Sequence, residues 1–180
     1  MKKLLLFLVI SIASISFADE KINSDSAIDN WSLISDSRLI TRGETVWGHQ
    51  FGFMKDLRAC DSDILLISWS TDISEGKLKE FEGKDAYIQL NIDGELLEEE
   101  LEFTLMFAGP LDSMEIGYFG AIVKSESFIE KLKQSSRIEL TFLKPANLLN
   151  ILDIKTDYFN TEGLNKSYSL LDNSCPIWKN

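Results

Sequence analysis

The sequence predicts a mainly β protein, a single antiparallel β-sandwich or flattened barrel with one short internal helix and a C-terminal helix. Two observations lead to this prediction. After residue 30, most of the chain divides into short apolar or alternating segments rich in β-branched and aromatic residues. Helical spacing of apolar residues appears in two short segments. A length of 180 residues, 44% of them hydrophobic and 26% charged, is typical of one globular domain.

The N-terminal segment has the features of a cleaved secretory signal peptide. Two lysines precede an apolar stretch over residues 4–15, and residues 16–18 place small side chains at the two positions that a signal peptidase reads. The stretch is short of the roughly 20 apolar residues that cross a bilayer. Asp19 stands where a bacterial lipoprotein has a cysteine. We expect cleavage after Ala18, no membrane insertion afterwards, and one periplasmic or secreted domain over residues 19–180.

The first strands are expected after a loose, polar segment over residues 19–29. The stretch VWGHQFGF alternates, and it places four side chains on one side of a period-two segment: Trp47, His49, Phe51 and Phe53. The stretch ILLISWS is a continuous apolar run, which predicts a central strand buried on both faces.

The clearest local signal is a β-hairpin. The segments AYIQLNI and ELLEEELEFTLMF are separated by Asp93-Gly94, a pair that readily forms a type I′ turn. A two-residue loop fixes the register, so Leu90 is expected opposite Leu97, and Ala86 opposite Leu101. The inner face then continues along the second strand through Leu101, Phe103, Leu105 and Phe107.

The outer face of this hairpin is acidic. The same register places Gln89 opposite Glu98 and Tyr87 opposite Glu100. It also places Glu99 on the apolar side of the hairpin, opposite an isoleucine. We therefore expect a β-bulge or an exposed strand end at this position.

The rest of the chain predicts two more strands and both helices. GYFGAIV is a strand, and SESFIEKLKQ is a short helix capped by Ser125 or Ser127, with an inner face of Phe128, Ile129 and Leu132. RIELTFL alternates until Pro145 ends the strand. TEGLNKSYSLLDN predicts a C-terminal helix that starts near Thr161, with Leu164, Tyr168 and Leu171 at helical spacing.

The two cysteines predict a disulfide. In an oxidising compartment, Cys60 and Cys175 are more readily a bridge than two free thiols. The carboxylates of Asp61 and Asp63 would raise the pKa of a thiol at Cys60, which disfavours a catalytic cysteine. No further ligands stand at zinc-like spacing, so a metal site is disfavoured as well. The bridge would attach the C-terminal helix to the sheet.

Catalytic motifs are absent from the sequence. The chain has one histidine, His49, and lacks the nucleophile elbow, the zinc-protease helix and the phosphate-binding loop. Folding could still bring a serine and an aspartate to His49, and a pair of carboxylates could still act as acid and base. We nevertheless assign no catalytic, cofactor-binding or metal-binding residue and expect a protein that is not an enzyme.

The aromatic row of Trp47, His49, Phe51 and Phe53 has two interpretations. Exposed, it would form a platform for a sugar ring or a peptide; buried, it is part of the core. We favour the core, because aromatic side chains dominate protein interiors.

Acidic residues dominate the predicted mature chain. Removal of the signal takes away two lysines, so 16 basic residues (18 − 2) and 29 acidic residues remain, a net charge of −13. This charge disfavours binding to nucleic acid and favours a partner with a basic surface. The acidic stripe of Glu98, Glu100 and Glu102 is then either a solvated face that prevents edge aggregation or a docking surface for a basic protein.

Soft motifs extend through most of the chain. They are Trp31 at the start of the first strand, a cysteine ahead of LLISWST, the strand YIQLNIDG, the helix FIEKL, and the final segment LDIKTDYFNTEGLNKSYSLLDNSC. Over residues 31–175 this set resembles the exported accessory proteins of the VasI type, which are associated with bacterial type VI secretion, and their uncharacterised relatives. The resemblance implies an exported, disulfide-linked, β-rich domain without known chemistry, so it assigns no catalytic residue.

The functional prediction is a non-enzymatic binding or accessory protein of a bacterial envelope. It would recognise a basic protein partner, with the acidic stripe as the candidate surface. The alternatives are a cell-wall hydrolase that uses carboxylates for acid and base catalysis and a protein that binds a small ligand.

Overall fold

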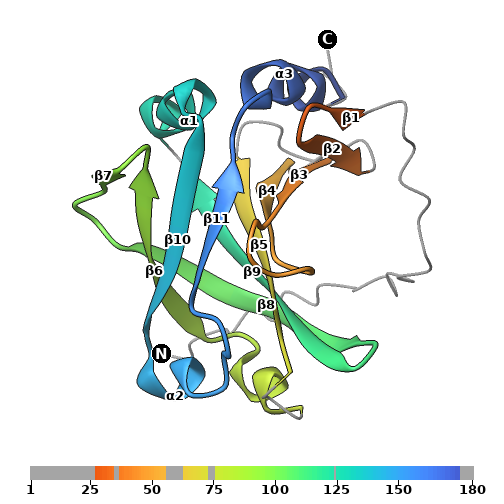
Figure 1. Ribbon diagram of the computed structural model, residues 1–180, viewed down its shortest axis with the longest axis vertical. Helices are drawn as coiled ribbons and strands as arrows, with labels where there is room; N and C mark the ends of the chain where they lie inside the picture. The colour runs from red at the N-terminus through yellow and green to blue at the C-terminus, as the bar shows by residue number, and fades with distance from the viewer. Residues whose placement is uncertain (1–26, 35–36, 56–62, 73–75, 124, 175–180) are drawn as a thin grey trace, which may run out of the picture.

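The computed structural model describes residues 27–34, 37–55, 63–72, 76–123 and 125–174. These residues form an 11-stranded antiparallel sheet with three α-helices and a short 3-10 helix (Figure 1), so the mainly β prediction is confirmed. The strands are β1 (Ala27–Ile28), β2 (Trp31–Ile34), β3 (Arg38–Arg42), β4 (Gln50–Lys55), β5 (Asp63–Thr71), β6 (Asp85–Ile92), β7 (Glu95–Leu96), β8 (Leu101–Leu111), β9 (Met114–Val123), β10 (Arg137–Lys144) and β11 (Thr156–Asn160). The helices are α1 (Glu126–Gln134), α2 (Ala146–Leu149), α3 (Leu164–Ser174) and the 3-10 helix η2 (Lys77–Phe81).

The sheet curls into a flattened barrel. Its strand order is β1-β2-β3-β4-β5-β9-β8-β6-β10-β11, with β7 beside β6. The last strand returns to the beginning of the order, because Gly43 forms a β-bridge with Phe159 and the Glu44 amide donates to the Tyr158 carbonyl at 2.8 Å. In Figure 1, α1 and α3 lie at one end of the barrel and α2 lies at the other.

The core is aromatic and lies inside the curled sheet. Alternate residues of each strand point inward, and the largest fully buried side chains are Trp31, Trp69, Phe51, Phe53, Phe103, Phe119, Phe142 and Phe159. Strand β5 lies between β4 and β9 and is buried at every position except Ile64. The continuous apolar run therefore forms the central strand that the sequence predicts.

The predicted hairpin turn is confirmed. Ile92 pairs with Glu95, and the Leu97 amide donates to the Leu90 carbonyl at 2.9 Å, as expected for a two-residue loop. Asp93 and Gly94 both have positive φ, at 51° and 89°, which a type I′ turn requires. The Asp93 carboxylate also accepts hydrogen bonds from the amides of residues 136 and 137.

Beyond the turn, the predicted register is wrong by two residues. Ala86 pairs with Phe103 rather than Leu101, and Tyr87 pairs with Glu102 rather than Glu100. The physical reason is the run of three glutamates at residues 98–100, which leaves the ladder between β7 and β8. This bulge keeps Glu99 off the apolar inner face and lets the following residues restore the alternation.

A second irregularity changes which face the end of β8 presents. The pairing of β8 with β9 shifts between Leu105 and Phe107. Phe107, which the sequence places on the inner face, is 44% exposed, and Ala108 is buried instead. The prediction for Phe107 is therefore wrong, because the bulge shifts the inward and outward positions of the strand by one residue.

The two predicted helices are present. The Ser125 hydroxyl caps α1 by accepting a hydrogen bond from the Phe128 amide at 3.3 Å. The C-terminal helix α3 begins at Leu164, three residues later than expected, and buries Leu164, Tyr168 and Leu171. The sequence reasoning missed two short helical segments, α2 and η2. It also missed β1, which lies at the end of the segment expected to be loose and pairs with β2.

A cluster of charged and hydroxyl groups connects α3 to the sheet. The Lys55 ammonium lies 2.7 Å from an Asp63 carboxylate oxygen and 2.8 Å from an Asp172 carboxylate oxygen, and the Tyr168 hydroxyl donates to Asp63. The predicted disulfide, Cys60 to Cys175, lies outside the described residues.

The disulfide prediction is tested with a thiol-reactive dye. We expect no labelled thiol in the denatured, non-reduced protein and two after reduction. Loss of the bridge should lower the free energy of unfolding by about 4 to 5 kcal/mol in the loop-entropy model, because the loop is long. The variants Cys60→Ser, Cys175→Ser and their double should be destabilised equally in denaturant titrations. Two labelled thiols before reduction would exclude the bridge.

Candidate functional site

The barrel wall opens between β8 and β9. These strands pair from their hairpin as far as Thr104 and Gly120. Beyond that point, residues 101–103 of β8 pair with β6 on one side, whereas residues 121–123 of β9 stay with β5. Figure 1 shows the two strands side by side at the hairpin and separating toward their other ends. The opening is a place where the sheet ladder is interrupted.

A groove of about 620 Å³ lies at this opening. Its side chains divide into buried or partly buried apolar groups and exposed carboxylates. Ile122, which is 66% exposed, adds an apolar side chain at the surface. We call this hollow the acidic groove and define it by Leu65, Leu97, Glu98, Glu99, Glu100, Leu101, Glu102, Ala121, Ile122, Val123, Ser125 and Phe128.

The three glutamates of the predicted stripe all line the acidic groove. They do not form one stripe on a sheet face, because Glu98 and Glu100 lie in the segment between β7 and β8 while Glu102 lies on β8. Glu99 also lines the groove and was not assigned to the predicted surface. The sequence did contain a signal for it, because the predicted register placed this charged residue opposite Ile88 on the apolar face, where it could not stay paired.

Two of the glutamates have partners on neighbouring strands. The Glu100 carboxylate pairs with the Lys144 ammonium at 2.6 Å. A hydrogen bond to Glu102 raises the pKa of the Tyr87 phenol. Among the described residues, Glu98 and Glu99 have no ion-pair partner. The groove therefore presents carboxylates that a cationic group can approach.

The aromatic row does not form a ligand platform. His49, Phe51 and Phe53 are fully buried and belong to the core, whereas Trp47 is 63% exposed. Trp47 precedes β4 and lies in the turn after β3, so the alternation of the strand does not extend to it. Gly48, between Trp47 and the strand, has a φ of 100°, a conformation that favours glycine and departs from that of a strand.

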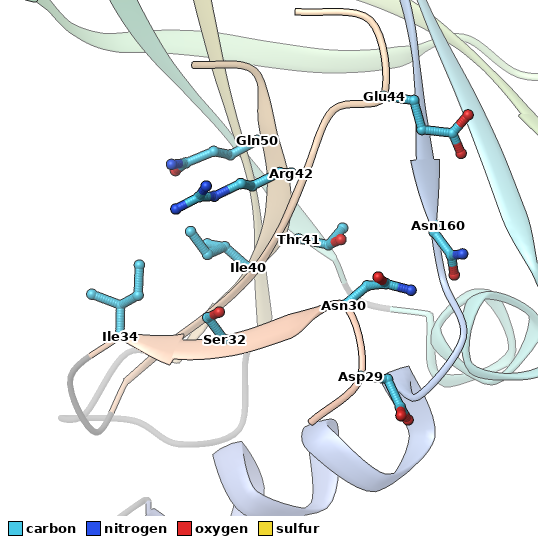
Figure 2. A pocket seen from close by; sticks show the side chains of 10 residues that line it. All are labelled: Asp29, Asn30, Ser32, Ile34, Ile40, Thr41, Arg42, Glu44, Gln50 and Asn160. Atoms are coloured by element: carbon cyan, nitrogen blue, oxygen red, sulfur yellow. The ribbon is translucent and has the colours of Figure 1, made fainter. Parts of the chain in front are cut away.

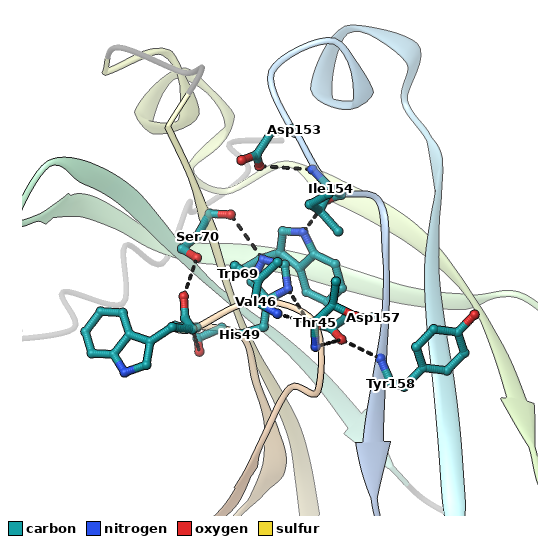
Figure 3. A network of polar contacts seen from close by, with 12 residues as sticks. Thr45, Val46, His49, Trp69, Ser70, Asp153, Ile154, Asp157 and Tyr158 are labelled. Atoms are coloured by element: carbon teal, nitrogen blue, oxygen red, sulfur yellow. Dashed lines mark hydrogen bonds and ion pairs between the residues drawn. The ribbon is translucent and has the colours of Figure 1, made fainter.

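His49 lies at the centre of a polar network inside the barrel, drawn in Figure 3. Its Nδ1 lies 2.8 Å from an Asp157 carboxylate oxygen, and its Nε2 lies 3.1 Å from the Ser70 backbone carbonyl. The ring stacks on Trp69, with the centroids 3.8 Å apart. Folding thus brings together a histidine, an aspartate and a serine.

This constellation lacks the geometry of a catalytic triad. The Ser70 hydroxyl donates to the Trp47 carbonyl at 3.2 Å, so it does not face the His49 ring. Both ring nitrogens face acceptors other than a hydroxyl nucleophile, and the side chains of His49 and Asp157 are fully buried. In a nucleophilic triad, the base needs a nitrogen facing the nucleophile and a substrate needs access to the hydroxyl. The network is therefore structural.

Asp157 joins β11 to the turn between β3 and β4. Its carboxylate accepts hydrogen bonds from the Thr45 amide at 2.8 Å, the Val46 amide at 3.2 Å and the Tyr158 amide at 2.7 Å. Burial alone would raise the pKa of Asp157, but the hydrogen bonds from Thr45, Tyr158 and His49 hold it below its ordinary value. Sequence reasoning missed this role of Asp157 because no local pattern marks it.

A second hollow, of about 560 Å³, lies over β2 and β3 and is shown in Figure 2. It is lined mainly by polar side chains and carries charges of both signs, including Asp29, Arg42 and Glu44. Asn160 contributes from the end of β11. This mixed lining has no charge preference comparable with that of the acidic groove.

The described residues hold neither a clustered set of metal ligands nor a long apolar helix. They contain no group of three or more histidine, cysteine or carboxylate side chains placed to hold a metal ion. Within the described ranges, no helix combines the length and the apolar character that a membrane span needs.

The polar network predicts a pH dependence of stability. Burial lowers the pKa of His49 below 6.5, against the opposing effects of Ser70 and Asp157. The unfolded chain then binds a proton more readily than the folded chain, so stability should decline as the pH falls below about 6.5. His49 is the only histidine, and His49→Gln should remove this slope and destabilise the fold by about 2 to 4 kcal/mol. Urea titrations from pH 5 to 7.5 measure both effects, and an unchanged slope in the variant would contradict the assignment.

The chain matches no protein-family model, no curated protein and no solved structure in the comparisons made with it. Its resemblance to the VasI type therefore stays a prediction.

Proposed function

We propose that this chain is an exported, non-enzymatic binding protein of a bacterial envelope that recognises a basic protein partner through the acidic groove. The observation that supports this proposal is the joint presence of four glutamates and an apolar lining where the barrel wall opens. An accessory role of the VasI type, beside a secretion system, is part of the same proposal.

The two kinds of side chain in the groove have different roles in binding. The partly buried apolar groups, such as Leu97 and Leu101, provide surface whose removal from water favours association. The exposed glutamates attract a basic partner over a longer range and act mainly on the association rate and its salt dependence. The predicted net charge of −13 on the mature chain strengthens this attraction.

The buried network supports a role without catalysis. Neither ring nitrogen of His49 faces a hydroxyl nucleophile, and the Ser70 hydroxyl donates to a backbone carbonyl. Acid and base catalysis would need a titratable group within reach of a substrate. The exposed carboxylates of the groove are titratable as well, and we assign them to pairing with the cations of a protein surface.

The proposal is tested by affinity capture from an envelope extract of the source cell. Tagged residues 19–180 should retain a basic protein at low salt and lose it at moderate salt, because exposed charges are screened. The triple variant Glu98→Gln, Glu100→Gln and Glu102→Gln should reduce capture at low salt by about tenfold while it keeps the fold.

A matched control separates the groove from overall charge. The triple variant Glu44→Gln, Glu80→Gln and Glu162→Gln changes the net charge equally at exposed positions that do not line the groove. It also removes one ion pair, that of Glu44 with Arg137, as Glu100→Gln removes that with Lys144. Equal capture by the two triple variants would exclude the acidic groove as the binding surface.

A further inference from the structure

We infer that the partner enters the acidic groove as an extended segment that adds a strand to the open edges of β8 and β9. This inference rests on the proposed function and specifies its mode of recognition. The occupant to which it commits is a peptide segment of the partner in which apolar and basic residues alternate.

The open edges are a consequence of the sheet topology. Thr104 pairs with both Asp85 of β6 and Gly120 of β9, so these two strands lie on opposite sides of β8. At residues 101–103 only the β6 side has a strand partner among the described residues, and at residues 121–123 only the β5 side has one. Backbone donors and acceptors on the other sides face the opening. A strand edge of this kind is a template for an added strand.

Along the two edges, exposed side chains lie level with exposed ones and inward side chains lie level with inward ones. Continuing the Thr104–Gly120 register would bring Glu102 level with Ile122, and both of these side chains are exposed. The residues on either side of them point inward and are apolar, namely Leu101, Phe103, Ala121 and Val123. An added strand therefore meets apolar neighbours at its inward positions, and Glu102 on one side and Ile122 on the other at its outward positions.

The looped-out glutamates determine which strand is accepted. Glu98, Glu99 and Glu100 lie at the mouth of the opening and favour lysine or arginine at the outward positions of the entering strand. The same carboxylates repel the edge of a second copy of this acidic chain. The groove thus combines an open edge with a charge that discourages self-association.

Hydrogen exchange gives the first test. In the free protein, the amides of residues 101–103 and 121–123 that face the opening should exchange much faster than those paired with β6 and β5. Slow exchange of all amides in both stretches would show that another part of the chain already occupies the edge. That result would overturn the inference.

A peptide gives the second test. We would titrate a seven-residue peptide of alternating valine and lysine, acetylated and amidated at its ends, and follow binding by calorimetry and amide protection. Two control peptides carry N-methyl groups, one on the valine amides and the other on the lysine amides. Each control keeps the charge and the side chains but blocks the hydrogen bonds of one strand edge. At least one control should bind about tenfold more weakly than the parent peptide, and the parent should protect the exposed amides of residues 121–123.

The outcomes separate this inference from the proposed function. If the parent peptide binds and both methylated peptides bind equally well, strand addition is wrong, and charge recognition by the groove stands. If the parent does not bind while capture of a basic envelope protein still depends on the groove glutamates, strand addition is again wrong. If that capture also fails, the proposed function and the inference both fall.

Discussion

The fold depends on one buried contact, that between Asp157 and the turn that precedes β4. Without it, β11 would be a free end of the sheet, and the core of aromatic rings would be open to water along one side. Asp157 accepts hydrogen bonds from two turn amides and contacts one nitrogen of His49, and it lies two residues from Phe159, which forms a bridge with Gly43 just after β3. A buried carboxylate is stable only when its oxygens are paired in this way. The polar contact closes the sheet over the aromatic core, and the buried Asp157 carboxylate is stable there because its oxygens are paired.

The barrel is closed at one seam and open at another. At the first seam, side-chain hydrogen bonds replace a regular ladder, whereas at the second seam β8 leaves β9 and pairs with β6. The long strand β8 pairs with β6 in its first part and with β9 in its second part. The sheet therefore separates where β8 changes from one partner to the other. The run of three glutamates lies next to this division because charged residues cannot continue the inner face. The same residues thus relieve a packing conflict and give the opening its negative charge.

Local patterns in the sequence were sufficient to predict much of the fold. The Asp93-Gly94 turn, the apolar run of β5 and the helical spacing of α1 and α3 each depend on neighbours within a few residues. The rest depends on contacts between distant residues. The Asp157–His49 contact joins positions 108 residues apart. The bulge before β8 and the register shift within it depend on the pairing of β8 with two different strands, which no single segment of sequence determines. The candidate surface was only partly predictable for the same reason: the glutamates were visible in the sequence, but the opening beneath them was not.

The closing contact also affects when the chain can fold. A polypeptide threaded across a membrane from its N-terminus presents the β3–β4 turn long before residue 157 emerges, so the aromatic core has no means of sealing until most of the chain has passed. Topologies dominated by such distant pairings fold slowly. In the proposed export, this order would keep the nascent chain loose during passage and would postpone compaction to the destination compartment.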